Sequence, residues 1–336
     1  MLEIDGSDGG GQILRSALAL SAITGEAITV DGIRGDRPEP GLRPQHLAAV
    51  DVMTAICEAD VEGATAGAET ITFRPGPITG GHYTSDIGTA GSLTLLFDCV
   101  LPLAWSLSAP LTLTANGGTD VKWSPPLAYL CHVKLPLLRQ AGFVGSVVRH
   151  RTGFYPTGGG RATLQLAPAS VTPLAVTQRG DLNGARVFSR AAEELADASV
   201  ADRQAETAVD RLDEAGIPVI ERTVTYETTP SSGSTLVVSL AYENTRAGFD
   251  ALGEPGKPAE DVANEAIDTL ETFQRGGGAV DVHLADQLLL PLAIVGGRLS
   301  IPQVTDHIET SLSLLSTFDF DVTLDRSTEP LTIESS

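Results

Sequence analysis

One histidine stands where the sequence predicts the start of a helix. His307 follows an apolar, strand-like run, and Thr305 or Asp306 just before it can cap the helix. A helix N-terminus presents unpaired N–H groups and the positive end of the helix dipole. Such a position attracts phosphate and favours an uncharged imidazole with a free lone pair. The alternative is an ordinary polar residue in the first turn of a helix.

Arginine is concentrated near the N-terminus. The cluster consists of Arg15, Arg34, Arg37 and Arg43. A glycine and several prolines make the stretch 34–44 a stiff loop, which Gln45 and His46 close as the next helix begins. Because guanidinium groups pair with phosphates through two parallel hydrogen bonds, the cluster predicts an anion-binding site. A structural network of ion pairs is the alternative.

A glycine-rich turn over 5–12 precedes the first helix. Its N–H groups could cradle phosphate, although the spacing matches neither a Walker loop nor a dinucleotide fingerprint. Asp5 and Asp8 could hold a magnesium ion, a metal that usually binds through one or two carboxylates beside a nucleotide. The alternative is that these carboxylates cap the helix.

A second polar cluster opens a helix near the end of the chain. His283 is followed one turn later by Asp286 and Gln287, and an apolar run comes next. This order is compatible with a buried helix whose polar end faces a nucleotide, and capping is again the alternative. The sequence contains no Gly-x-Ser-x-Gly, His-Glu-x-x-His or Cys-x-x-Cys motif, so serine hydrolase and zinc sites have no support.

The elements that must position these residues form an α/β (α+β) pattern that occurs three times. The first pass predicts an N-terminal strand, a helix over 12–24, a strand over 27–33, a helix over 44–58 and a strand over 69–73. The second begins near position 82 and predicts a helix from 93, a strand over 111–115, a helix over 124–142 and strands over 145–150 and 161–166. The third starts with a short strand near 174 and resumes with a helix over 283–293, a strand over 298–301, a helix over 306–315 and a strand over 320–324.

The third pass is interrupted by a segment with its own alternation of strands and helices. It predicts strands over 185–189, 219–226 and 234–242 and helices over 200–216 and 259–275. We therefore expect a core of three repeated helix-strand-helix-strand units over 1–180 and 279–336, and a smaller inserted α+β domain over 181–278.

The bulk composition describes a soluble, acidic protein. The net charge is −21, and only three of the 22 basic residues are lysines. Either the partners are not polyanions, or the protein works in a halophilic, salt-rich cytoplasm where repulsion is screened to about 3 Å. The three cysteines are scattered among apolar residues, which indicates reduced core residues. The sequence shows no secretion signal or membrane span, so we expect a cytoplasmic protein without a membrane partner.

Taken together, the motifs resemble the RNA 3'-terminal phosphate cyclase family, in its archaeal and bacterial catalytic type. The resemblance covers essentially the whole chain, with the motifs in the family's order. They are Asp5-Gly6, Gly9-Gly10-Gly11-Gln12-Ile13-Leu14-Arg15, Ile33-Arg34-x-x-Arg37, Pro40-Gly41-Leu42, Gln45-His46-Leu47, Gly117-Gly118-Thr119-Asp120, Gly153-Phe154-Tyr155-Pro156-x-Gly158-Gly159-Gly160 and Leu284-Ala285-Asp286-Gln287.

The resemblance implies ATP-dependent conversion of an RNA 3'-phosphate to a 2',3'-cyclic phosphate. A histidine, matched by His307, attacks the α-phosphorus of ATP and forms a covalent histidine-AMP. The AMP then passes to the RNA 3'-phosphate, and the neighbouring 2'-hydroxyl displaces it. The resemblance also implies RNA with a 3'-phosphate end and ATP as partners, together with a divalent metal, Mg or Mn.

The family's binding residues are carried over by motif. Arg15, Arg34, Arg37 and Gln45 match phosphate contacts. Pro125, Tyr129, His283, Leu284, Ala285, Asp286 and Gln287 match nucleotide contacts. The sequence departs from the family pattern at three places: Asp8 stands where a metal-binding Glu is usual, Asp98 where a Gln is expected and His283 where a Tyr is expected. A non-catalytic relative that acts in RNA processing and an enolpyruvyl transferase are the competing interpretations.

Overall fold

The computed structural model describes residues 1–8 and 10–336. Gly9, part of the glycine-rich turn, lies outside the described residues. The first unit forms a four-stranded sheet in the order β1-β2-β4-β3, in which β1 and β2 are parallel and the other pairs antiparallel. Its elements are β1 (Leu2–Asp5), α1 (Gly11–Thr24), β2 (Ile28–Asp31), α2 (Pro44–Cys57), β3 (Asp60–Glu62) and β4 (Ile71–Arg74).

The second unit repeats this order as β5-β6-β8-β7, again with one parallel and two antiparallel pairs. Leu111, Leu113 and Ala115 alternate with half-buried residues along β6, as the period of a strand requires. The elements are β5 (Gly81–Asp86), α3 (Leu93–Val100), the 3₁₀ helix η1 (Leu101–Trp105), β6 (Leu111–Gly117), α4 (Leu127–Tyr129), the π-helical turn η2 (Leu130–Lys134), α5 (Leu135–Gln140), β7 (Val144–Arg151) and β8 (Gly160–Ala167).

The third unit has the same topology although its first strand is distant in sequence. Leu174 pairs with Gly297 in parallel, and the sheet order is β9-β14-β16-β15. The elements are β9 (Leu174–Val176), α8 (Val282–Gln287), α9 (Leu289–Val295), β14 (Gly297–Ile301), α10 (Asp306–Thr317), β15 (Val322–Asp325) and β16 (Leu331–Ser335). The α/β fold and its threefold repetition are confirmed. Each unit has two more strands than the helix-strand-helix-strand pattern, because one strand precedes the first helix and two consecutive strands end the unit.

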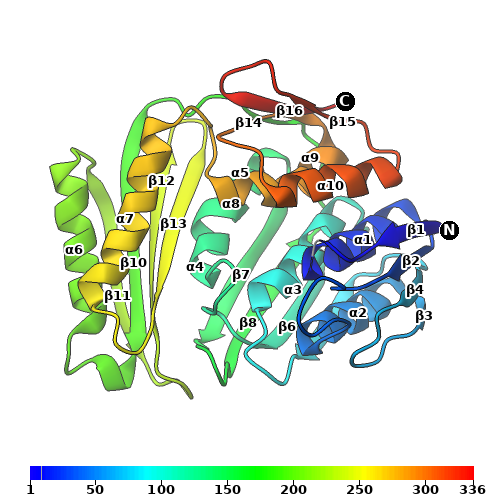
Figure 1. Ribbon diagram of the computed structural model, residues 1–336, viewed down its shortest axis with the longest axis horizontal. Coiled ribbons are helices and arrows are strands. Elements are labelled where there is room, and N and C mark those ends of the chain that lie inside the picture. The colour runs from blue at the N-terminus through cyan, green and yellow to red at the C-terminus, as the bar shows by residue number, and fades with distance from the viewer. Residues whose placement is uncertain (9) are drawn as a thin grey trace.

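Between β9 and α8 the chain builds a fourth sheet, in the order β11-β10-β12-β13. Its helices pack on one face, toward the left of Figure 1, over an apolar cluster distinct from that of the repeated units. The opposite face meets α4 and η2. The elements are β10 (Leu182–Ala192), the 3₁₀ helix η3 (Glu193–Leu195), α6 (Val200–Glu214), β11 (Val219–Glu227), β12 (Ser234–Tyr242), β13 (Arg246–Gly253) and α7 (Ala259–Arg275). The boundaries 181 and 278 for a separate domain stay a prediction.

Two predicted helices differ from the observed ones. The helix expected over 124–142 begins at Leu127, because Pro126 adopts an extended conformation as its N-cap, and a π-helical turn interrupts it. The helix expected over 283–293 divides at Leu288 into α8 and α9. Within the described part of the chain, no helix is long and apolar enough to cross a membrane. Burial raises the pKa of Cys57 and of Cys99 to about 12, so both are free, protonated thiols.

Candidate active site

A cleft with a volume of about 1100 Å³ brings most of the predicted site residues together. Its lining residues come from α1, the loop before α2, α3, α4, α8 and α10, and from β13, the connection after it and α7. The predicted residues that line it are Arg15, Arg34, Arg37, Gln45, Asp98, Pro125, Tyr129, His283, Asp286, Gln287 and His307. Asp8, Leu284 and Ala285 are not among the lining residues.

His307 lies in the first turn of α10, as predicted. Thr305 is the N-cap, and its hydroxyl accepts a hydrogen bond from the Ile308 N–H at 3.3 Å. Ser311, one turn later on the same face, accepts a hydrogen bond from Gln12 Nε2 at 3.1 Å. This bond ties the His307 face of α10 to the start of α1, beside the glycine-rich turn. The histidine is exposed to the cleft, so its imidazole is accessible to a ligand.

The glycine-rich turn is crowded by cationic and imidazole side chains. The Arg37 guanidinium lies 3.3 Å from the place where a Cβ at Gly10 would stand, and Gly10 has a φ of 59° that favours glycine. A Cβ at Gly11 would overlap the His46 ring and come within 2.8 Å of Arg15 Nη1. Glycine at these two positions lets the charged groups approach the backbone of the turn.

His46 is held as an uncharged ring inside this cationic cluster. Its Nδ1 accepts a hydrogen bond from the Arg43 N–H at 3.1 Å, which caps α2. Burial, followed by the charges of Arg15, Arg34 and Arg43, lowers the pKa of His46 to about 3. At neutral pH, His46 therefore contributes no positive charge to the cluster.

The arginines differ in how they are held. Arg34 donates hydrogen bonds to the carbonyl groups of Glu39 and Gly41 at 2.8 and 3.0 Å, which fixes its fork within the loop. Burial lowers the pKa of Arg15, whose charge is partly offset by nearby Asp98. Within residues 1–8 and 10–336, Arg15, Arg34 and Arg37 form no ion pair with a carboxylate. Their charge is available to an anion such as a phosphate.

All three lysines of this lysine-poor chain line the same cleft. Lys134 Nζ lies 2.8 Å from Asp98, Lys122 Nζ lies 2.8 Å from Glu254, and Lys257 pairs with Glu265. Four arginines and three lysines therefore face a cleft in a protein whose net charge is −21. Sequence reasoning missed the lysines as site residues, although their scarcity was a usable signal.

Two carboxyl groups in the cleft are strongly perturbed. Burial raises the pKa of Asp286 to about 6. Burial, followed by the charges of Asp281 and Asp120, raises the pKa of Asp250 on β13 to about 7. Near neutral pH a fraction of each group is protonated, so these carboxyl groups neutralise less of the positive charge in the cleft. Asp250 was not predicted, because β13 was not recognised as a strand.

Asp281 anchors helix α8 to its surroundings. Its carboxylate accepts hydrogen bonds from the N–H groups of His283 and Leu284, from Tyr129 Oη at 2.8 Å and from the Gly248 N–H of β13 at 2.9 Å. Tyr129 is only 1% exposed, so it presents very little of its surface to the cleft.

Leu284 and Ala285 lie on the face of α8 that is packed into the core, and neither side chain is exposed. Their nucleotide contact stays a prediction. Their apolar side chains fix the helix that presents Asp286 and Gln287.

The proposed metal ligand lies beside the cleft lining. The side-chain hydrogen bond and the charge of Asp36 raise the pKa of Asp8, so the two carboxylates are close neighbours. Such a pair suits a magnesium or manganese ion that takes its remaining ligands from substrate phosphates and water. In the described ranges, no group of three or more His, Cys, Asp or Glu side chains could hold a metal without such help.

Comparison with known proteins agrees with this geometry. The family model described as RNA 3'-terminal phosphate cyclase matches residues 7–324. An RNA 3'-terminal phosphate cyclase of Halobacterium salinarum is 44% identical over 333 residues, covering 96% of each chain. Proteins of the same name from Pyrococcus furiosus and Methanosarcina barkeri are 40% and 41% identical, each over 95% of this chain and 93% and 94% of their own. The chain belongs to the RNA 3'-terminal phosphate cyclase family.

Proposed function

We propose that this protein is an ATP-dependent RNA 3'-terminal phosphate cyclase that works through a covalent adenylate on His307. The observation that carries the proposal is the position of His307. It stands in the first turn of α10, open to a cleft where Arg15, Arg34 and Arg37 are free of carboxylate partners within the described residues. A nucleophile in the same cleft as unpaired cations suits attack on a polyanion.

The reaction proceeds in three nucleophilic displacements at phosphorus. A nitrogen of the His307 ring attacks the α-phosphorus of ATP, the bond to the bridging oxygen breaks, and pyrophosphate leaves. An oxygen of the RNA 3'-phosphate then takes the AMP from the histidine, which restores the free ring. Finally the neighbouring 2'-hydroxyl attacks the 3'-phosphorus, loses its proton and releases AMP, which closes the 2',3'-cyclic phosphodiester.

The cleft residues have distinct parts in this scheme. Arg15, Arg34, Arg37 and Gln45 hold the phosphates, and their charge stabilises the negative oxygens as the bond to pyrophosphate breaks. The nucleoside lies against Pro125 and Tyr129, near His283, Asp286 and Gln287. The carboxylates of Asp8 and Asp36 would hold the divalent ion, which supplies further neutralisation of phosphate charge when bound.

The test is to incubate the protein with ATP labelled at the α-phosphate. We expect a labelled protein whose adduct is stable in base and lost in acid, because a phosphorus–nitrogen bond on histidine is acid-labile. His307→Ala should abolish the label. The matched control is His82→Ala, since His82 is also exposed but lies on β5, outside the cleft lining.

The competing interpretations predict other results. A non-catalytic RNA-processing relative would bind RNA and form no adduct, and an enolpyruvyl transferase would require phosphoenolpyruvate and form no adduct. A label of undiminished yield in His307→Ala would show that another residue is the nucleophile.

We also propose that residues 181–278 form a separate domain and that the protein is cytoplasmic.

A further inference from the structure

A tryptophan stands on the rim of the cleft with almost no protein around its ring. Trp123 lines the cleft and is 92% exposed. Its backbone has a φ of 62°, the left-handed region that side chains rarely adopt. Neither burial nor backbone preference explains a large aromatic residue here. The contribution of the ring to the fold is therefore small.

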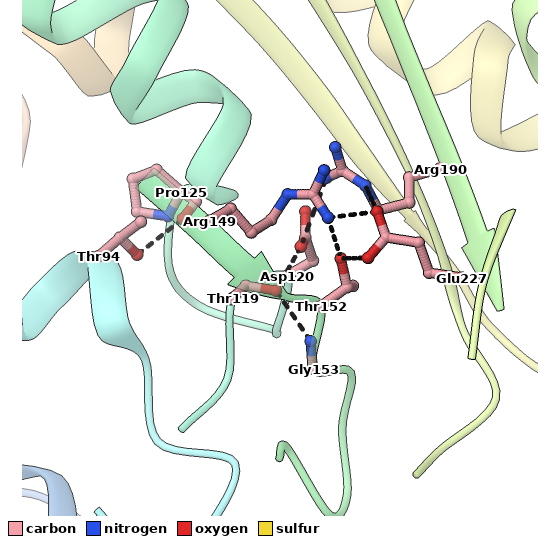
Figure 2. A network of polar contacts seen from close by, with 9 residues as sticks. All are labelled: Thr94, Thr119, Asp120, Pro125, Arg149, Thr152, Gly153, Arg190 and Glu227. Atoms are coloured by element: carbon pink, nitrogen blue, oxygen red, sulfur yellow. Dashed lines mark hydrogen bonds and ion pairs between the residues drawn. The ribbon is translucent and has the colours of Figure 1, made fainter. Parts of the chain in front are cut away.

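The loop that carries Trp123 is nevertheless held firmly on both sides. Before it, the Thr119 N–H donates to the Gly153 carbonyl at 2.9 Å, and the Gly153 N–H donates back to Thr119 Oγ1 at 3.0 Å. After it, Thr94 Oγ1 donates to the Pro125 carbonyl at 2.8 Å. Figure 2 shows these contacts at the base of the loop. The ring is free, but its point of attachment is fixed.

The same loop is tied to the fourth sheet through charged groups. Arg190 of β10 lies 4.0 Å from Asp120, and Glu227 of β11 accepts a hydrogen bond from Thr152 at 2.8 Å and pairs with Arg149 (Figure 2). Next to the tryptophan, Lys122 pairs with Glu254. Loop 119–125 thus spans the junction between the second unit and the fourth sheet, at the mouth of the cleft.

The charge around the ring favours a nucleic acid. Lys122, its chain neighbour, pairs with Glu254, but three arginines of the same cleft have no carboxylate partner among the described residues, whereas the whole protein carries a net charge of −21. Single-stranded nucleic acids bind where aromatic rings stack on bases beside cations that follow the backbone.

We propose that Trp123 is a stacking platform for a nucleobase at the 3' end of the RNA substrate. The inference rests on the proposed function. Stacking on an exposed ring whose backbone attachment is held in place orients the terminal nucleotide toward the cleft without reading its sequence, because every base presents a flat aromatic face. Trp123 is thus a positioning residue that acts on the RNA and takes no part in the adenylylation of His307.

The test separates RNA binding from adenylylation. Binding of a fluorescent, 3'-phosphorylated oligoribonucleotide is measured by anisotropy without ATP, and labelling by α-labelled ATP is measured without RNA. Trp123→Ala should weaken RNA binding roughly 5- to 100-fold, Trp123→Phe should restore most of it, and labelling should be unchanged in both. The matched control is Tyr155→Ala, since Tyr155 is 60% exposed and lies outside the cleft lining.

Oligonucleotides that lack one base identify the stacked partner. Removing the terminal or the penultimate base should lower the RNA affinity of the wild-type protein by the same factor as Trp123→Ala does. The same removal should not lower the RNA affinity of Trp123→Ala any further. Equal binding by Trp123→Ala and wild type, or an equal abasic penalty in both, overturns the inference. Loss of labelling in Trp123→Ala assigns the ring to the adenine of ATP and also overturns it. Failure of the wild type to become labelled counts against the proposed function alone.

Discussion

The ammonium group of Lys134 lies 2.8 Å from the carboxylate of Asp98 at the wall of the cleft, with 5% and 17% of the two side chains exposed. The pair gives a physical account of the carboxylate at a position where the family resemblance predicts glutamine. The charge of Asp98 is balanced by Lys134 of the π-helical turn η2, so the wall of the cleft carries no isolated negative charge there.

Removing one member of this pair should leave the other charge partly buried and unpaired. We predict that Lys134→Met lowers the free energy of unfolding by about 3 kcal/mol. Urea unfolding at constant salt measures the change. The double variant Lys134→Met with Asp98→Leu should recover most of the loss, because neither charge then remains. Equal stability of Lys134→Met and wild type would show that the pair is not formed in solution.

His46 should make the protein acid-sensitive. Its pKa is about 3 in the folded state and 6.5 in the unfolded chain, so below pH 6.5 only the unfolded chain gains the proton. Stability should therefore fall as the pH drops, by about 2 kcal/mol between pH 7 and pH 5. His46→Asn, which keeps a hydrogen-bond acceptor, should lack this part of the loss. Parallel pH profiles of the two proteins would contradict the prediction.

Asp250 should affect the pH dependence of stability in the opposite direction. Its pKa is raised from 3.8 to about 7, so the unfolded chain loses the proton first and stability falls as the pH rises from about 4 to 7. Asp250→Asn should match wild type at pH 4 and exceed it at pH 8 by about 2 kcal/mol, since the half-buried side chain keeps some solvent contact. The exposed Asp210→Asn on α6 is the control, and it should show no such crossover.

Gly11→Ala tests the close approach of His46 and Arg15 to the glycine-rich turn. The new methyl group must displace both side chains. We expect labelling by ATP to slow roughly 10- to 100-fold while the fold is retained, as judged by circular dichroism. Gly276→Ala, whose methyl group would come no closer than 3.4 Å to another atom, should behave as wild type. Unchanged labelling in Gly11→Ala would place the phosphates away from this turn.

The net charge of −21 predicts a requirement for salt. At about 1 M salt the screening length is near 3 Å, so the repulsion among surface carboxylates is largely removed. We predict that the melting temperature and the labelling rate both rise between 0.1 and 2 M KCl. Full stability and activity in dilute buffer would argue against this adaptation.

Long amphipathic helices and buried strands could be predicted well from the sequence. The structure begins α1, α2, α6, α7 and α10 within a residue of their predicted starts, because a clear apolar period coincides with a local start signal. The missed strands are β3, β13 and β16. β3 is short, and β16 pairs with β14, which lies far from it in sequence. β13 forms a hairpin with β12, but its strand signal is weak because Ala247, Gly248 and Ala251 have low strand propensity.

Residues of the cleft that belong to a recognisable sequence motif could be predicted. Residues that reach the cleft only through the tertiary fold could not. Arg15, Arg37 and His307 meet in one cleft as expected. Asp250 and Glu254 reach the cleft only because β13 joins a sheet that the sequence pattern left incomplete. Leu284 and Ala285 share a motif with Asp286, yet the helical period turns them into the core.

The confinement of lysine to the cleft has a chemical consequence. Apart from the α-amino group of Met1, the primary amines of the protein are those of Lys122, Lys134 and Lys257. Acylating reagents and amine-coupled supports, which normally modify a protein surface at random, would here react at the mouth and walls of one cleft. A ligand that fills the cleft would shield all three lysine amines from such reagents.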